Sequence, residues 1–200
     1  MAILKIARMG HPVLRRVADP VPDPADPLVR RLAADMAETM VDAGGVGLAA
    51  PQVHESVRLI VFRLPRERRQ PGEEEEGPSG ITVLVNPKIV PVGDEMLSGW
   101  EGCLSIPGLR GVVPRHARIL YRGFDLDGSP IEREATGFHA RVVQHEVDHL
   151  DGVLYLERMD DLRWLGFNEE SLRYQLAETE GTGGEGKAEG KAEGKAEGKE

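Results

Sequence analysis

The sequence has few of the features that mark secreted or membrane proteins. Cys103 is the only cysteine, so no internal disulfide can form. Aromatic residues make up 4% of the 200-residue chain, and no apolar run approaches the ~20 residues of a membrane-spanning helix. The first residues, "MAILKIARMG", contain only a short, interrupted apolar stretch, and no small-residue cleavage site follows. We therefore expect a cytoplasmic protein without a membrane span.

Positive charge is also scarce. The chain has 25 Lys and Arg residues against 34 Asp and Glu residues, which gives a formal net charge of −9. A general nucleic-acid-binding surface needs clustered basic residues that neutralise phosphates. The composition argues against such a surface, and the expected partner is a small molecule or a peptide.

The length favours one main domain, because dividing 200 residues between two cores would leave each of them marginal. We expect this domain to span residues 1–178. Within it, the charged segment 65–80, "PRERRQPGEEEEGPSG", is predicted to be a surface loop insertion. Residues 179–200 repeat Gly, Lys, Ala and Glu without large apolar residues, so a disordered tail is predicted.

Apolar periodicity predicts an α+β fold built from antiparallel β-sheets. Runs of β-branched and apolar residues predict strands, and "DGSP" is typical of a hairpin turn that leads into a further strand, "IEREA". No alternation of strands and helices indicates a parallel sheet. The predicted strands are 57–64, 81–90 and 117–125, and the turn is 127–130.

Three helices are predicted around these strands. The first begins with Asp26 as N-cap and Pro27 at the first position, and it ends at Gly44. The central helix runs from Thr136 to Leu150, and a last helix runs from about Asp160 to Leu176. A core-facing stripe on the first helix is formed by Leu28, Leu32, Met36 and Met40.

The central helix carries the most informative motif, "VVQHEVDHLDG" at 142–152. His145 and His149 lie four residues apart, so both imidazoles project from one helical face. Glu146 lies beside the first histidine, where it can reach a metal-bound water. In metalloproteases this H-E-x-x-H pattern supplies two ligands and a general base. The motif therefore predicts a metal site.

The third ligand is open to more than one interpretation. A downstream histidine is excluded because Tyr155 occupies the position where that motif requires it. Glu169 lies about as far beyond His149 as the glutamate ligand of thermolysin-like proteases. Cys103 would instead complete a Cys-His-His site with an open position for water. Spacing alone does not decide between Glu169 and Cys103.

Three segments together resemble the signature motifs of bacterial peptide deformylases, in the usual order. They are "GVGLAAPQ" (45–52), "EGCLS" (101–105) and "QHEVDH" (144–149). The segment "GHPVLRRVADPV" (10–21) also resembles that family. The resemblance implies Cys103, His145 and His149 as metal ligands. It implies Fe²⁺ as the physiological ion, with Zn²⁺, Ni²⁺ or Co²⁺ able to occupy the same site.

The resemblance also implies an activity, namely removal of the N-formyl group from the formyl-methionine that begins a new protein, with release of formate. The metal would lower the pKa of its water, and Glu146 would act as general base and then as general acid. The Gln52 side chain and the Leu104 backbone N–H would stabilise the oxyanion.

The glycine-rich segment suggests how a peptide would bind. Gly45 and Gly47 have no Cβ, so their backbone can approach an extended peptide closely enough to pair with it. Val46 and Leu104 would help to line a pocket for the methionine side chain. Two interpretations stay open for Glu101: an ion pair with Arg110 or Arg115 that holds the cysteine loop, or a set of solvated charges.

The expected partners are nascent formyl-methionyl peptides, and the expected state is a monomer. Some bacterial deformylases approach the ribosome near its exit tunnel through a basic C-terminal helix, whereas the tail of this chain is nearly balanced in charge. Two other classes of function compete with this interpretation. One is a zinc endopeptidase or aminopeptidase that uses His145, His149 and Glu169, and the other is a metal-binding module without activity.

Overall fold

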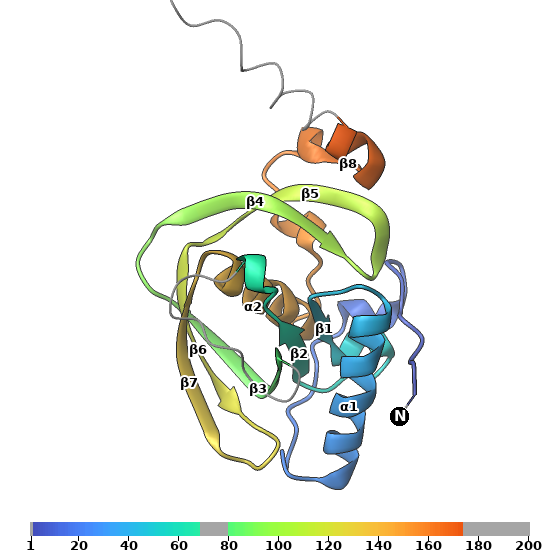
Figure 1. The fold of residues 1–200 in the computed structure, drawn as a ribbon, viewed down its shortest axis with the longest axis vertical. Helices are drawn as coiled ribbons and strands as arrows, with labels where there is room; N and C mark the ends of the chain where they lie inside the picture. Colours follow the sequence, from blue (N-terminus) through green and yellow to red (C-terminus); the bar gives the residue numbers. More distant parts are fainter. Residues whose placement is uncertain (1, 69–79, 174–200) are drawn as a thin grey trace, which may run out of the picture.

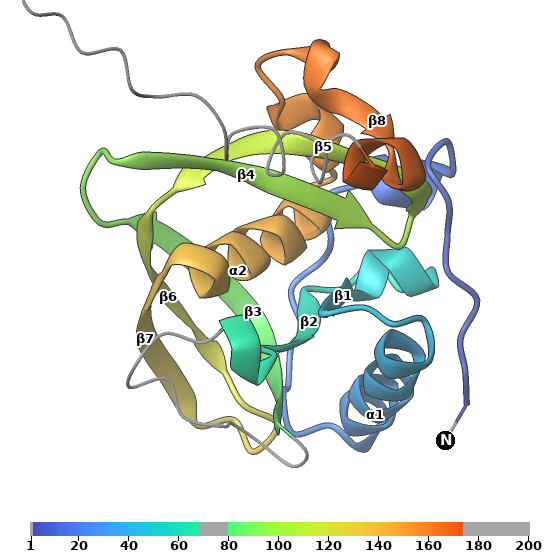
Figure 2. The ribbon, with the colours of Figure 1, turned by 45° about the horizontal axis from the view of Figure 1, so that its top comes forward.

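The computed structural model of this chain describes residues 2–68 and 80–173. The fold is α+β, as predicted: two antiparallel sheets enclose a central helix, α2 (Gly137–Leu150). Figure 2 shows α2 lying between the strands of the small sheet and those of the large one. The predicted 65–80 insertion falls mostly outside the described residues, and the predicted 179–200 tail lies wholly outside them.

The larger sheet has five strands in the order β1-β2-β3-β6-β7, and the smaller sheet has three in the order β4-β5-β8. The predicted strands at 57–64, 81–90 and 117–125 correspond to β2, β3 and β6, and the predicted turn joins β6 to β7. The strands are β1 (Gly47–Ala49), β2 (Leu59–Arg63), β3 (Ile81–Pro91), β4 (Met96–Cys103), β5 (Ile106–His116), β6 (Arg118–Phe124), β7 (Pro130–Thr136) and β8 (Leu165–Phe167).

Helix α1 (Pro27–Asp42) begins as predicted, with the Asp26 carboxylate accepting a hydrogen bond from the Leu28 N–H at 2.8 Å. It packs on β1 and β2 through Met36 and Met40, which are fully buried. The prediction that Leu28 faces the core was wrong, because this first-turn side chain is 74% exposed. The core-facing stripe therefore begins one turn later than the sequence pattern indicated.

Helix α2 is buried on nearly all sides because both sheets cover it (Figure 1). Val143 and Leu150 belong to the same hydrophobic cluster as Ile60 and Tyr121 of the large sheet. Full burial of a side chain such as valine or leucine contributes about 1.5–3 kcal/mol. Apolar packing on one side of α2 thus fixes the polar residues that it carries on the other side.

The smaller sheet depends on glycine where other elements approach it. A Cβ on Gly99 would lie 2.9 Å from the guanidinium group of Arg141, and one on Gly111 would lie 2.6 Å from the sulfur of Met159. A larger residue at either position would displace the end of the Arg141 or Met159 side chain that lies against the sheet. This sheet was not predicted, because its glycines and prolines interrupt the strand pattern.

The C-terminal helix begins later than predicted. Residues near Asp160 do not start it, since Leu162–Trp164 form a 3₁₀ turn and Leu165–Phe167 form strand β8. Helical backbone then starts at residue 168 and continues to residue 173, the end of the described region. Pairing of β8 with β5 satisfies backbone groups of a segment that would otherwise extend the helix.

Candidate metal centre and active site

Three predicted ligands converge between β4 and α2. The ligand atoms of Cys103, His145 and His149 all lie within 4.8 Å of one another. The Cys103 Sγ is 3.3 Å from the His149 Nε2. Cys103 is the last residue of β4, and the histidines occupy successive turns of α2. Docking of the small sheet on α2 therefore assembles the ligand set.

The His145 ring is oriented by Glu101. Its Nδ1 lies 2.8 Å from the Glu101 carboxylate, which leaves Nε2 free to face Cys103. Glu101 also receives two hydrogen bonds from Arg115, at 2.9 and 3.0 Å. Burial would raise the Glu101 pKa, but these His145 and Arg115 contacts hold it well below its usual value. The predicted ion pair thus forms with Arg115, while Arg110 stacks over Trp100 instead.

The local charges favour the thiolate form of Cys103. Burial by itself would raise its pKa, but the nearby His149 and His145 rings lower the pKa well below the ordinary value. A thiolate is the form of cysteine that binds metals. The electrostatics are therefore those of a ligand rather than of an inert core cysteine.

These residues fit a metal ion. Bond lengths of about 2.0–2.3 Å in a tetrahedral site separate neighbouring ligand atoms by about 3.5 Å. The observed spacing is close to this arrangement without rearrangement of the backbone. The hydrogen bond from His145 to a buried carboxylate is the usual second contact of a metal-binding histidine. The ligand set leaves room for a fourth position on the cavity side.

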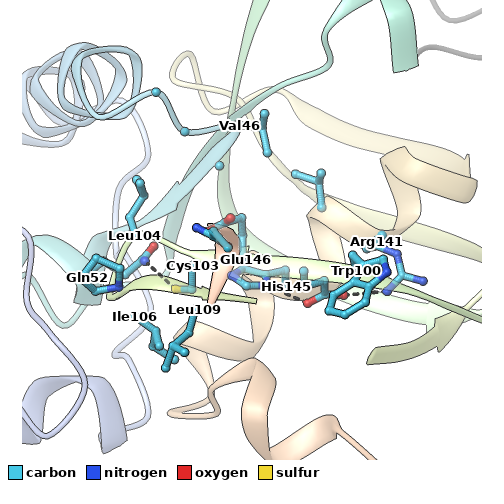
Figure 3. Close-up of a pocket in the computed structure, with 18 of the residues that line it drawn as sticks. Val46, Gln52, Trp100, Cys103, Leu104, Ile106, Leu109, Arg141, His145 and Glu146 are labelled. Atoms are coloured by element: carbon cyan, nitrogen blue, oxygen red, sulfur yellow. Dashed lines mark hydrogen bonds and ion pairs between the residues drawn. The ribbon is translucent and has the colours of Figure 1, made fainter. Parts of the chain in front are cut away.

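Glu146 lies beside the ligand cluster and faces the cavity (Figure 3). Its Oε2 is buried and has no hydrogen-bond partner among the described residues. Burial raises the pKa of Glu146 to about 7, against the opposing effect of the two histidines. A carboxylate near this pKa can exchange protons efficiently at neutral pH.

Gln52 and Leu104 flank the cluster on its other side (Figure 3). The Ala49 N–H donates to the Gln52 Oε1 at 2.8 Å, so the Gln52 amide nitrogen must point the other way. That nitrogen lies 3.4 Å from the Cys103 sulfur and 3.1 Å from the Ser105 hydroxyl. Among the described residues, no hydrogen bond uses the Leu104 N–H. The Gln52 amide is therefore directed toward the ligand cluster.

The glycine-rich segment forms one wall of the cavity. Strand β1 is at the edge of its sheet and pairs only with β2, so its outer edge is not used by another described strand. A Cβ on Gly47 would lie 2.6 Å from the carboxyl carbon of Glu146. Gly47 is therefore required for Glu146 to lie where it does, in addition to any contact with a substrate.

The cavity has a volume of about 430 Å³, enough for a few amino-acid residues. Polar groups of the ligand cluster occupy its floor, and apolar side chains form much of its wall. The wall includes Val46, Leu104, Ile106, Leu109, Phe138 and Val142, together with Gly45 and Gly47.

Other candidate ligands lie elsewhere. Within residues 2–68 and 80–173, Cys103, His145 and His149 form the one group that could hold a metal, and Glu169 is not part of it. His139 packs against Tyr121 in the core, and the exposed rings of His11 and His54 contact each other at 4.7 Å between centroids. These histidines therefore have structural or surface positions.

The structure adds residues that the sequence did not single out. Arg141 donates to Glu101 at 2.8 Å and lies four residues before His145, a helical spacing that could have indicated it. Ser105 accepts from Gln52, and the Tyr155 ring stacks on His145 at 6.2 Å between centroids. No local pattern indicates these two contacts, because they depend on how separate segments meet.

Comparison with known proteins gives a consistent picture. The sequence profile of the polypeptide deformylase family matches residues 3–164. Peptide deformylase 1 of Xanthomonas campestris is 53% identical over 175 residues, covering 87% of this chain and 99% of that protein. Peptide deformylase 1 of Bordetella pertussis is also 53% identical, over 82% of this chain and 92% of its own length.

Solved structures are similar as well. A class I type b peptide deformylase from Acinetobacter baumannii has a TM-score of 0.72 at 37% identity, covering 80% of this chain and all 100% of that one. The peptide deformylase of Thermotoga maritima has a TM-score of 0.70 at 35% identity, with the same coverage. The fold, the converging site residues and these relatives agree, and the chain belongs to the polypeptide deformylase family.

Proposed function

We propose that Glu146, Gln52 and the Leu104 N–H carry out the reaction of this enzyme. It removes the N-formyl group from the terminal formyl-methionine of newly made proteins and releases formate. The proposal rests mainly on one observation. The buried, unpartnered carboxylate oxygen of Glu146 faces the same cavity as the Cys-His-His cluster. This arrangement combines a proton acceptor with a metal site in one enclosed space.

We propose Cys103, His145 and His149 as the ligands of one Fe²⁺ ion, with Zn²⁺, Ni²⁺ or Co²⁺ able to replace it. One thiolate and two imidazoles suit each of these metals. When bound, the metal supplies Lewis-acid activation of water and of the formyl oxygen. Arg115 and Glu101 act through His145, since they fix the ring orientation that this ligand needs.

Glu146 would accept a proton from the attacking water and later deliver it to the leaving amine nitrogen. Its unpartnered oxygen is available for the first transfer, and its pKa near neutrality suits the second. The Gln52 amide and the Leu104 N–H would donate hydrogen bonds to the oxyanion that develops on the formyl group. Because Ala49 and Ser105 hold Gln52 in place, this donor needs little reorganisation during the reaction.

The peptide would bind as an extended strand along Gly45, Val46 and Gly47. The open edge of β1 offers backbone groups for pairing, and the missing side chains at the glycines allow close approach. Val46 and Leu104 would line the methionine pocket, since both border the cavity. We propose that the enzyme acts as a monomer in the cytoplasm on nascent peptides, near the ribosomal exit tunnel.

We further propose that the catalytic domain spans residues 1–178, with 65–80 as an insertion and 179–200 as a tail outside it. Within the described ranges, no helix combines the length and apolar character needed to cross a bilayer.

The decisive experiment measures formate release from formyl-Met-Ala-Ser by protein prepared anaerobically with Fe²⁺, beside the zinc form. Oxygen is excluded because a thiolate ligand is open to oxidation. We expect release from the iron form. Absence of formate from both forms would reject the proposal, whereas cleavage of an unformylated peptide would favour a peptidase.

A further inference from the structure

Two arginines beside the cavity rest on aromatic rings that line it. The Arg68 guanidinium lies 4.7 Å from the centroid of Phe138, and the Arg110 guanidinium lies 4.6 Å from that of Trp100. Arg68, Phe138 and Trp100 all line the cavity. Stacking holds each side chain in place while leaving its edge N–H groups free to bind an anion.

No ion pair compensates these two charges within residues 2–68 and 80–173. Arg141 also lines the cavity, but it donates to the Glu101 carboxylate and to the Val113 carbonyl, at 2.8 and 2.7 Å. Arg68 and Arg110 contact rings instead of carboxylates. Among residues 2–68 and 80–173, these two guanidinium groups therefore place positive charge that no carboxylate pairs with beside the cavity, in a chain whose net charge is −9.

The two charges also influence each other. Burial lowers the pKa of Arg110, and the positive charge of Arg68 lowers it further. The two guanidinium groups therefore lie close enough to repel one another. A carboxylate between or beside them would relieve this repulsion and form charge-assisted hydrogen bonds.

The aromatic rings under the two arginines line the cavity that a bound peptide would occupy. In Figure 3, Gln52 and Leu104 lie on one side of the ligand cluster, and Trp100 and Arg141 lie on the other. A peptide whose formyl group reaches Glu146 fills the inner part of the cavity with its methionine. Trp100 lines the same cavity, so the residues that follow can pass beside it and near Arg110, which stacks on its ring.

We propose that Arg68 and Arg110 make the enzyme prefer nascent peptides that carry an Asp or Glu side chain shortly after the formyl-methionine. This inference rests on the proposed function, because it assumes that the cavity holds a formylated peptide. It adds a preference that neither the ligand cluster nor the methionine pocket would produce.

The test compares kcat/KM for formyl-Met-Ala-Ala-Ala amides that carry Asp, Asn or Lys at the second, third or fourth position. Asn matches Asp in shape without its charge. Partly exposed charge pairs contribute little to binding. We therefore expect kcat/KM for the Asp peptide to exceed that for the Asn peptide by about twofold to fivefold at one or more positions. Lys should fall below Asn at the same position, and the Asp preference should shrink at about 0.5 M salt.

Variants assign the effect to the two arginines. In the double variant Arg68→Gln/Arg110→Gln, the ratio of kcat/KM for the Asp peptide to kcat/KM for the Asn peptide should fall to about one. The double variant Arg68→Lys/Arg110→Lys should keep part of this preference. Arg122→Gln is the matched control, because it removes one positive charge from β6, where Arg122 pairs with Glu132 at 2.5 Å. It should retain the full ratio.

The outcomes separate the two proposals. The proposed role of the arginines would be overturned by kcat/KM ratios of Asp to Asn peptides near one at every position in the wild-type enzyme. An unchanged ratio in the Gln double variant would overturn it as well. Either result would leave deformylation itself intact. No formate from any of the peptides would overturn the proposed function and this inference with it.

Discussion

At the scale of single residues, Glu146 has a buried carboxylate oxygen, Oε2, without a hydrogen-bond partner among the described residues. Glu146→Gln keeps the shape of the side chain but removes its ability to accept a proton. We expect metal content to stay near wild type and kcat to fall by about 10²–10⁴-fold, the usual contribution of a general base. Metal analysis beside formate release measures both, and unchanged turnover would rule out the assigned role.

A substitution at Gly47 tests whether the position of the Glu146 carboxylate matters for catalysis. A methyl group at this position would meet the Glu146 carboxyl group, so Gly47→Ala should push the base out of place. A displacement of about 1 Å can cost about 10²-fold in rate. We expect a loss of this size in kcat with normal metal content. A variant with full activity would show that Glu146 tolerates the shift, and loss of metal would indicate a wider distortion.

The residues of the centre were predictable to the extent that they lie in short motifs. Helical spacing identified His145, Glu146 and His149, while Cys103 was chosen over Glu169 only through the resemblance to deformylases. Arg68 was not recognised, because its importance depends on where the chain carries it relative to Phe138. Contacts of this kind are set by tertiary structure and leave no periodic signal in the sequence.

At the scale of elements, a buried network joins the small sheet to α2. Arg115 of β5 bridges Glu101 of β4 and Asp148 of α2, at 2.9 and 2.5 Å, and its side chain is only 5% exposed. Arg141 and Arg158 provide additional contacts to the same carboxylates. The network therefore holds the strand that carries Cys103 against the helix that carries both histidines.

We expect Arg115→Met to lower the free energy of unfolding by about 3 kcal/mol, because two buried carboxylates would each lose a partner. This is the lower end of the usual range, since Arg141 and Arg158 remain. The affinity for metal should fall as well, because Glu101 would no longer be held against His145. Urea denaturation and metal titration would measure the two effects.

Arg118→Gln is the matched control for this prediction. Arg118 pairs with Glu134 across β6 and β7, but both side chains are about half exposed. Removing an exposed pair should change the free energy of unfolding by about 0–1 kcal/mol and leave metal affinity unaltered. Equal losses in the two variants would show that burial of the Arg115 network is unimportant.

Prediction of the elements succeeded where the apolar pattern was regular. The α1 cap, α2 and strands β2, β3 and β6 follow from capping residues and β-branched runs. The small sheet was missed because its glycines serve packing, as Gly111 does beneath Met159. The start of the last helix was misplaced because β8 gains its stability from pairing with β5, which lies more than fifty residues earlier in the chain.

At the scale of the whole molecule, metal binding should stabilise the native state. The ligands are brought together only in the folded protein, so the unfolded chain binds the ion less well. At a free metal concentration of 100 Kd the stabilisation is about 2.7 kcal/mol. Chelation should therefore lower Tm by about 5–10 °C. A Tm that does not respond to chelation would contradict this coupling.

The same measurement distinguishes the two candidate third ligands. Cys103→Ala should abolish metal retention and show the low Tm of the chelated protein without any chelator. Glu169→Gln should keep both metal and activity, since Glu169 is outside the ligand group. Metal that is retained in the cysteine variant and lost in the glutamate variant would reject the proposed ligand set.

Helix α2 links the completion of the core to the completion of the metal site. The helix supplies both ligand histidines, and it also supplies five residues of a main core cluster, Ala140, Val142, Val143, Val147 and Leu150. A truncated chain that ends before α2 lacks two metal ligands and leaves the inner face of the large sheet uncovered. Such a product would lack part of the ligand set and expose apolar surface, which favours its unfolding and proteolysis.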